Sequence, residues 1–156
     1  MRVRRLLIAV LLLAGLQAGS FAHEVPNEVT VLAFLKPEGQ TLRFLVRAPM
    51  ASLRDVSVPV FGPGYLQISA ADAAFRDAAT LWISDFVELY ENGRPLPKPT
   101  VRAVRAELPS SRSFQSYEAA LADVLGPPLP DDTNLYWEQG VLDVLFEYPI
   151  TSDQSQ

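Results

Sequence analysis

The chain has 156 residues, of which 49% are hydrophobic and 20% charged, and this composition is typical of one folded domain and excludes a largely disordered chain. Its formal net charge is -5 and its basic residues are scattered, which excludes a nucleic-acid-binding surface. With no cysteine and a single histidine, the sequence also excludes disulfides, thiolate chemistry, multi-histidine zinc sites and a triad with an internal histidine.

The N-terminal segment has the three parts of a secretory signal peptide. Arginines at positions 2, 4 and 5 precede the apolar run Leu6–Leu16, which is too short to span a bilayer comfortably. Small residues, Ser20 and Ala22, then occupy the positions that signal peptidase reads. We expect residues 1–22 to be removed, which leaves an exported, periplasmic or extracytoplasmic chain of net charge -8 that begins at His23. Retention of the leader as a membrane anchor is the alternative.

The first half of the mature chain favours strands. Glu28–Leu35 and Thr41–Ala48 flank a predicted turn at Lys36–Gly39 and form a β-hairpin. Val56–Val60 and Tyr65–Ser69 flank the turn-forming residues 62–64 in the same way.

The middle of the chain changes period. Ala70–Leu81 is rich in alanine and predicts a helix, with Ser69 and Asp72 at the spacing of a capping box. Phe86–Tyr90 then runs into Asn92 and Gly93, which favour a tight hairpin turn, and Thr100–Leu108 is the returning strand. A helix that continues to Tyr90 is the alternative.

The last third contains the second helix and a final hairpin. Ser113 is placed to cap a helix over Phe114–Leu125, which the residues 126–128 (Gly-Pro-Pro) terminate. Leu135–Glu138 and Val141–Tyr148 are predicted to pair across a turn.

This order of elements predicts a mainly β fold, with an α+β fold as the alternative. The expected architecture is an antiparallel, Ig-like β-sandwich with two inserted helices. Residues 23–148 form this one domain, and residues 149–156 are a polar C-terminal tail or a truncated linker. Alternation along the last strand places one set of residues inside and the other set, including Asp143, on the opposite face. The inward set is Leu142, Val144 and Phe146.

His23 is the one candidate metal ligand. A free amino group and the ring Nδ1 of an N-terminal histidine can chelate a cupric ion together, and Glu24 would have to replace the second histidine that such copper sites use. A periplasmic small-ligand or copper- or nickel-binding protein is therefore the alternative function. The simpler interpretation is that His23 only follows the cleavage site.

Carboxylates and aromatic residues are the remaining candidates. An acid–base pair, as in glycoside hydrolysis, has no spacing here that singles out two carboxylates, so we expect a solvated acidic surface and no enzyme. The carboxylates considered are Asp85, Glu88, Glu91, Asp131, Asp132, Asp143 and Glu147. Aromatic residues that serve either as a ligand platform or as core packing are Trp82, Phe86, Tyr90, Tyr136, Trp137, Phe146 and Tyr148.

Three stretches of the sequence carry a resemblance to a known family. They are HEVPNEVTVLAFLKPEGQTLRFLVRAPM from His23, ISDFVELYENGRPLP from Ile83 and LYWEQGVLDVLFEYPITSD from Leu135. They resemble the extracytoplasmic N-terminal region that precedes the membrane part in bacterial proteins of the HupE/UreJ-like family. The resemblance implies an accessory domain of a membrane protein, in a family linked to nickel or cobalt uptake and to hydrogenase or urease maturation.

The chain departs from that family because the polytopic membrane core is missing from it and no residue matches the metal-handling motif. We therefore expect a non-catalytic exported interaction domain. Its expected partner is a membrane protein, or the missing membrane core itself.

Overall fold

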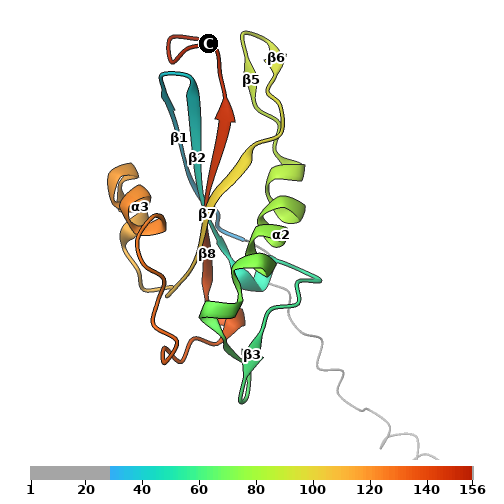
Figure 1. Cartoon of the computed structure of the whole chain (residues 1–156), viewed down its shortest axis with the longest axis vertical. Coiled ribbons are helices and arrows are strands. Elements are labelled where there is room, and N and C mark those ends of the chain that lie inside the picture. The colour runs from blue at the N-terminus through green and yellow to red at the C-terminus, as the bar shows by residue number, and fades with distance from the viewer. Residues whose placement is uncertain (1–28, 156) are drawn as a thin grey trace, which may run out of the picture.

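The computed structural model describes residues 29–155, and its main feature is one antiparallel four-stranded sheet with the strand order β1-β2-β8-β7 (Figure 1). These strands are β1 (Leu32–Glu38), β2 (Thr41–Pro49), β7 (Thr100–Glu107) and β8 (Val141–Pro149). Two small hairpins are added by β3 (Val60–Phe61) with β4 (Tyr65–Leu66) and by β5 (Tyr90–Glu91) with β6 (Arg94–Pro95).

Two α-helices and five short 3₁₀ turns complete the described chain. The α-helices are α2 (Asp72–Trp82) and α3 (Tyr117–Val124). The 3₁₀ turns are η1 (Met50–Ser52), η2 (Ile68–Ala70), η3 (Ser84–Phe86), η4 (Ser113–Gln115) and η5 (Trp137–Gln139). In residues 29–155, none of these helices has the length and apolar character needed to cross a membrane.

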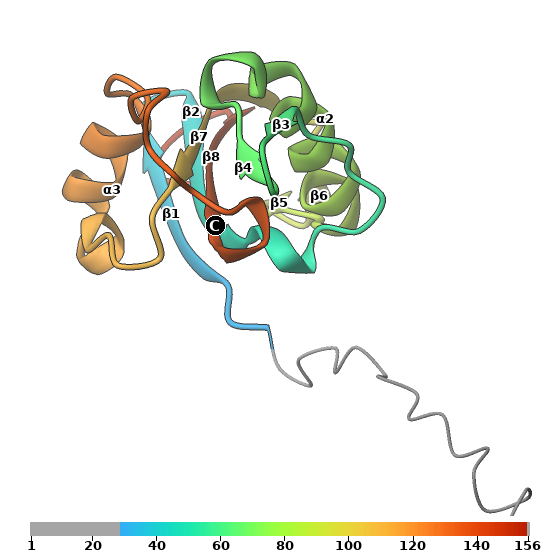
Figure 2. The ribbon, with the colours of Figure 1, turned by 90° about the horizontal axis from the view of Figure 1, so that it is seen from below.

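The sheet lies between the two helices, with α3 on one side and α2 on the other (Figure 2). Because β-strand side chains alternate, β2 and β8 contribute to both layers. The layer beneath α2 contains Phe44, Val46, Leu142, Val144, Phe146 and Phe75. The layer beneath α3 contains Leu45, Leu145, Phe114, Ala120 and Val124.

The mainly β class and the two helices are confirmed, whereas the Ig-like sandwich is not. In the described part of the chain, helices cover the two faces of the main sheet, and the other strands form only two-residue hairpins. The inward residues of β8 are as expected. Asp143 and Leu145, predicted on the opposite face, are also buried, because α3 packs there.

The first hairpin forms, but its turn lies later than predicted. Glu38 pairs with Thr41, so Gly39 and Gln40 make the turn and Lys36–Glu38 belong to β1. Gly39 has φ +61°, which glycine adopts without the steric penalty of a side chain. At Asn92 and Gly93 the predicted tight turn is confirmed, since both residues have positive φ.

Other predicted strands are wrong in length or partner. The strand over Val56–Val60 shrinks to β3, and Phe86–Tyr90 contributes only the start of β5, which also rules out a helix reaching Tyr90. Leu135–Glu138 does not form a hairpin with β8, because β2 and β7 already pair with the two edges of β8. Tyr136 instead makes an isolated bridge to Tyr65.

Both predicted helix caps are also wrong. Ser69 makes no side-chain cap on α2, and its backbone N–H is bonded by Asp131 instead. In α3 the cap is Ser116, whose Oγ accepts a hydrogen bond from the Ala119 N–H, and Ser113 lies in η4. The Ser113 hydroxyl accepts a hydrogen bond from Arg47, and α3 begins at Tyr117, three residues later than predicted.

Candidate functional site

A buried ion pair joins β2 to β8 beneath α3. Arg47 donates from Nε and Nη2 to the two carboxylate oxygens of Asp143, at 2.7 and 2.6 Å. The two residues are direct cross-strand partners, and Asp143 is 0% exposed. Burial raises the pKa of the Asp143 carboxyl, against the opposing effect of Arg47. Arg47 also bonds Ser113, at 2.8 Å, and lies over the Phe114 ring.

A second set of charges ties β7 to the end of α3. Arg105 pairs with Glu107 at 3.2 Å and with Asp123 at 3.5 Å, and it donates to the backbone carbonyls of Asp123 and Pro127. The Asp123 carbonyl lies in the last turn of α3, where a cation is favourable, and Pro127 follows the end of the helix. The Arg105 set holds the end of α3 on the sheet, whereas Arg47 bonds Ser111 and Ser113 in the segment before α3. The carboxylate of Asp143 is sealed from solvent.

The candidate carboxylates are not gathered into one site. Four of them bond separate partners: Asp85 with Lys98, Glu88 with the Tyr90 hydroxyl, Asp131 with the Ser69 N–H, and Glu147 with Arg43. Hydrogen bonding to Ser69 holds the pKa of Asp131 below its usual range. Asp85 and Glu88 line the same pocket, but each carboxylate is bonded to a different partner.

Glu91 anchors the segment after β8. Its carboxylate accepts hydrogen bonds from the N–H and hydroxyl of Thr151, at 2.8 to 3.0 Å, and from the N–H of Ser152 at 3.3 Å. Hydrogen bonding by Ser155, followed by Thr151 and Ser152, lowers the pKa of Glu91. Residues predicted to be a tail or linker are thus attached to the β5–β6 hairpin.

This attachment is expected to depend on pH. Because the pKa of Glu91 is lowered in the folded state, its stabilising contribution is complete above the ordinary carboxyl range and is lost as the pH falls through the folded pKa. Amide hydrogen exchange at Thr151 and Ser152 should accelerate at acidic pH relative to the exchange of β8 amides. Glu91→Gln should give the fast exchange already at pH 7, and unchanged protection in this variant would contradict the assignment.

The predicted metal ligand, His23, lies outside the described residues, so copper or nickel binding there stays a prediction. Within residues 29–155, no group of three or more His, Cys, Asp or Glu side chains is arranged to hold a metal ion.

The candidate aromatic residues do not form one platform. Phe146 is in the core, and Tyr148 is buried with its hydroxyl unpartnered, which raises its pKa by desolvation. Tyr136 packs edge-on against Tyr65 and donates to the carbonyl of Pro63. Trp82 and Phe86 stack on each other, with ring centroids 6.2 Å apart.

Trp82 and Phe86 form one wall of an apolar groove beside β1. Its volume is about 230 Å³, below the usual range for a drug-sized ligand. It suits a few apolar side chains better than a cofactor. The groove is lined by Val31, Phe44, Val46, Ala48, Ser52, Leu53, Trp82, Ile83, Phe86 and Val87.

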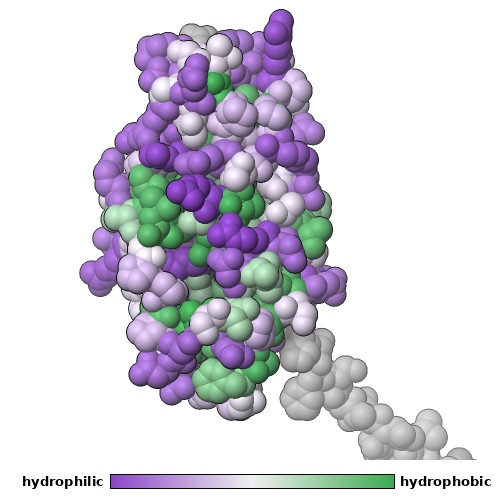
Figure 3. All heavy atoms as spheres, viewed as in Figure 1, coloured by the Kyte–Doolittle hydropathy of each residue, from purple (hydrophilic) through white to green (hydrophobic). Residues whose placement is uncertain are grey.

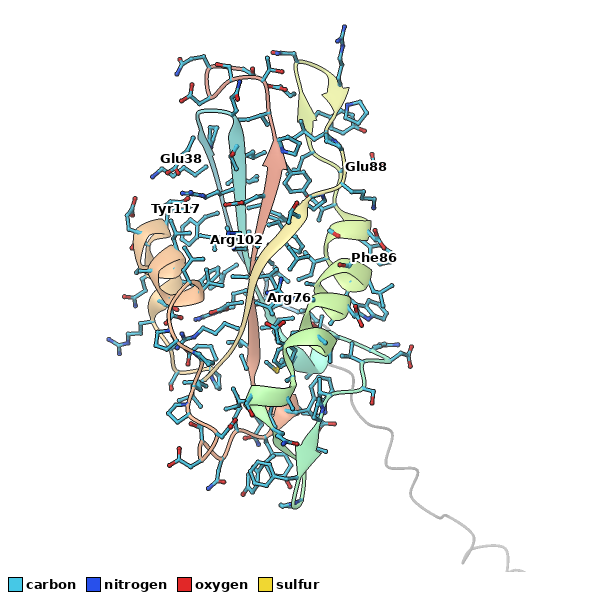
Figure 4. All side chains as sticks on the ribbon, in the orientation of Figure 1. Glu38, Arg76, Phe86, Glu88, Arg102 and Tyr117 are labelled. Atoms are coloured by element: carbon cyan, nitrogen blue, oxygen red, sulfur yellow. The ribbon has the colours of Figure 1, made fainter. Side chains whose placement is uncertain are left out.

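The groove exists because α2 covers only part of its face of the sheet. It packs chiefly toward β7 and leaves the β1 side open. Two side chains that line the groove are unusually exposed for their type, Phe86 at 75% and Val31 at 50%. Leu35 is 54% exposed and lies on the same face of the sheet, because it pairs with the lining residue Phe44. Phe86 lies on the α2 side of the sheet, and Tyr117 lies on the α3 side (Figure 4).

Figure 3 shows the molecule in the view of Figure 1, with β7 toward the viewer. In Figure 3 its hydrophobic patches are separated by hydrophilic residues. On the opposite face of β1, Phe34 packs against Phe114 and Tyr117 at 5.8 and 6.3 Å between ring centroids, whereas Leu32 is 44% exposed. Val31, Leu35 and Phe86 are thus three exposed large apolar side chains at the groove face, and other exposed ones, such as Phe61 and Leu125, lie elsewhere.

Sequence reasoning did not identify the groove. The available signal was the run Leu32–Leu35, which is apolar at consecutive positions instead of alternating. Such a run is typical of a strand that is buried on both faces, although β1 is an edge strand with one face open.

Comparison of this chain with protein-family models, with curated proteins and with solved structures found no match.

Proposed function

We propose that this chain is a non-catalytic interaction domain that works outside the cytoplasm and holds an apolar segment of a membrane-protein partner in the groove beside β1. The observation that carries the proposal is the exposure of Phe86, Leu35 and Val31 around this groove. Covering a side chain of this size is worth roughly 1.5–3 kcal/mol, so a partner would gain from binding there.

The leader and the family resemblance support the location and the kind of partner. Residues 1–22 have the order of a signal peptide, and the stretches from His23, Ile83 and Leu135 resemble the exported region of HupE/UreJ-like membrane proteins. An Ig-like sandwich stays a proposal from the sequence. It would require a second sheet, packed on the part of the main sheet's face that α2 leaves open.

The arrangement of charges supports a role in binding. Asp143 has no route to a substrate, and Glu91 holds the segment at Thr151. Phe86 is the most exposed large apolar side chain, and no contact within the described chain accounts for this exposure.

Site-specific photocrosslinking of the exported protein tests this function. A benzoylphenylalanine at position 86 should crosslink a protein of the membrane fraction, because the groove holds the partner there. The same group at position 125 is the matched control, since Leu125 is 52% exposed and belongs to the opposite layer. Leu35→Asp should weaken the crosslink at position 86 at least tenfold. Equal labelling from both positions, or none, would count against the function.

A further inference from the structure

The hairpin geometry determines which backbone groups of β1 point to its free edge. Glu38 and Thr41 close a two-residue turn, so they form a hydrogen-bonded pair, and bonded and non-bonded pairs then alternate along the strands. Leu32, Phe34 and Lys36 therefore bond β2. The N–H and C=O groups of Ala33 and Leu35 point away from β2, at an edge that no other strand of the described chain covers.

Proline 37 fits this alternation. Pro37 pairs with Leu42 at a non-bonded position, where its missing N–H removes no bond to β2. It also blocks pairing at the turn end of the free edge. The accessible edge is thus limited to the first half of β1.

The side chains of Ala33 and Leu35 lie on the face of the sheet that carries the groove, next to residues that line it. Ala33 is directly opposite Val46 and Leu35 is directly opposite Phe44, so all four lie on one face of the sheet. Val46 and Phe44 line the groove. A strand added at this edge would therefore place every second side chain on the groove face.

We propose that the partner segment binds as an extended strand added to the free edge of β1, with apolar side chains at alternate positions packed at the groove. This inference rests on the proposed function and specifies the partner's chemistry. Backbone hydrogen bonds to Ala33 and Leu35 supply the register, and the groove selects the side chains, as in other cases of β-strand addition.

The size of the surface favours one strand over a second copy of the chain. The exposed parts of Val31, Leu35 and Phe86 add up to an apolar surface on the order of 400 Å² or less. A stable protein–protein interface needs about 800 Å² from each partner. A single short strand would bury only the free edge of β1 and the groove, so this smaller surface is sufficient for it.

Fluorescence anisotropy with defined peptides tests strand addition. The probe is the labelled peptide KVTVTVTVK, whose valines fall on one face of a strand. The first control peptide is N-methylated at the valines. In an antiparallel strand with its valines on the groove face, this removes the donors that face β1 and keeps the apolar side chains. The second, KSTSTSTSK, keeps the backbone and removes the apolar face. Only KVTVTVTVK should bind, at least tenfold more tightly than either control.

Two matched substitutions separate the edge from the groove. Ala33→Pro removes the outward N–H without removing a bond to β2, so it should leave the circular dichroism spectrum unchanged and weaken binding at least tenfold. Ala33→Val keeps the N–H and should bind as the unchanged protein does. Phe86→Asp should also weaken binding, because it places a charge at the groove.

The outcomes distinguish this inference from the proposed function. If Phe86→Asp abolishes peptide binding while Ala33→Pro and N-methylation do not, the groove binds its partner without strand addition and the inference is wrong. A dimer in sedimentation that Ala33→Pro dissociates would make a second copy the occupant. If the protein binds phosphatidylethanolamine–phosphatidylglycerol vesicles in a Phe86-dependent way and does not bind the peptide, the occupant of the groove is a membrane surface. Either result, or no binding of any probe, overturns the inference.

Discussion

Asp143→Ala is expected to lower the free energy of unfolding by about 3–5 kcal/mol, which is typical when one partner of a buried ion pair is removed. The variant leaves the Arg47 guanidinium without its carboxylate, with Ser111 and Ser113 as its hydrogen-bond partners and the Phe114 ring packed on it. Urea denaturation monitored by tryptophan fluorescence measures the change.

The matched control removes both charges. In the double variant Arg47→Met, Asp143→Leu, apolar side chains replace the pair and no buried charge is left unpaired, so most of the lost stability should return. The raised pKa of Asp143 agrees with this expectation, because desolvation outweighs the effect of Arg47 on that carboxyl. A loss below about 1 kcal/mol in Asp143→Ala alone would show that the pair is not buried as described.

Leu145→Ala is expected to cost about 2–5 kcal/mol, and Leu145→Lys more, because the lysine would bury an unpaired ammonium group. Leu145 is 1% exposed and packs in the layer beneath α3. In the predicted sandwich it would instead lie on the face opposite the core, where both substitutions would have little effect. Thermal and urea unfolding of the two variants therefore separate the two architectures.

Leu125 provides the matched position for this experiment. It follows α3 directly and is 52% exposed, so Leu125→Ala and Leu125→Lys should each stay within about 0.5 kcal/mol of the unchanged protein. Equal losses at positions 125 and 145 would contradict the burial of β8 by α3.

Local patterns in the sequence predicted the elements well where a few neighbouring residues decide the structure. Asn92 and Gly93 turn as expected because their backbone conformations depend on little beyond the dipeptide. The α2 region forms a helix close to its predicted limits, and β7 and β8 follow the predicted strands to within one residue at each end.

Local sequence patterns predicted the candidate site less well. Asp143 was predicted on the face opposite the core, because the sequence does not reveal that α3 covers this face or that β2, which carries Arg47, is the neighbour of β8. Likewise, Phe86 is one of several aromatic residues in the sequence, and it is distinguished only by where α2 ends above the sheet.

The sequence by itself determined the mainly β composition, the positions of the two helices, the absence of cysteine and the inward set Leu142, Val144 and Phe146, since these depend on composition and on short-range periodicity. Only the tertiary structure decided that β8 lies between β2 and β7 and that a helix covers each face of the sheet. Strand neighbours and helix placement are set by contacts between residues far apart in the chain, which no local pattern encodes. The groove beside β1 is a consequence of that placement, because it is the part of the sheet that α2 does not reach.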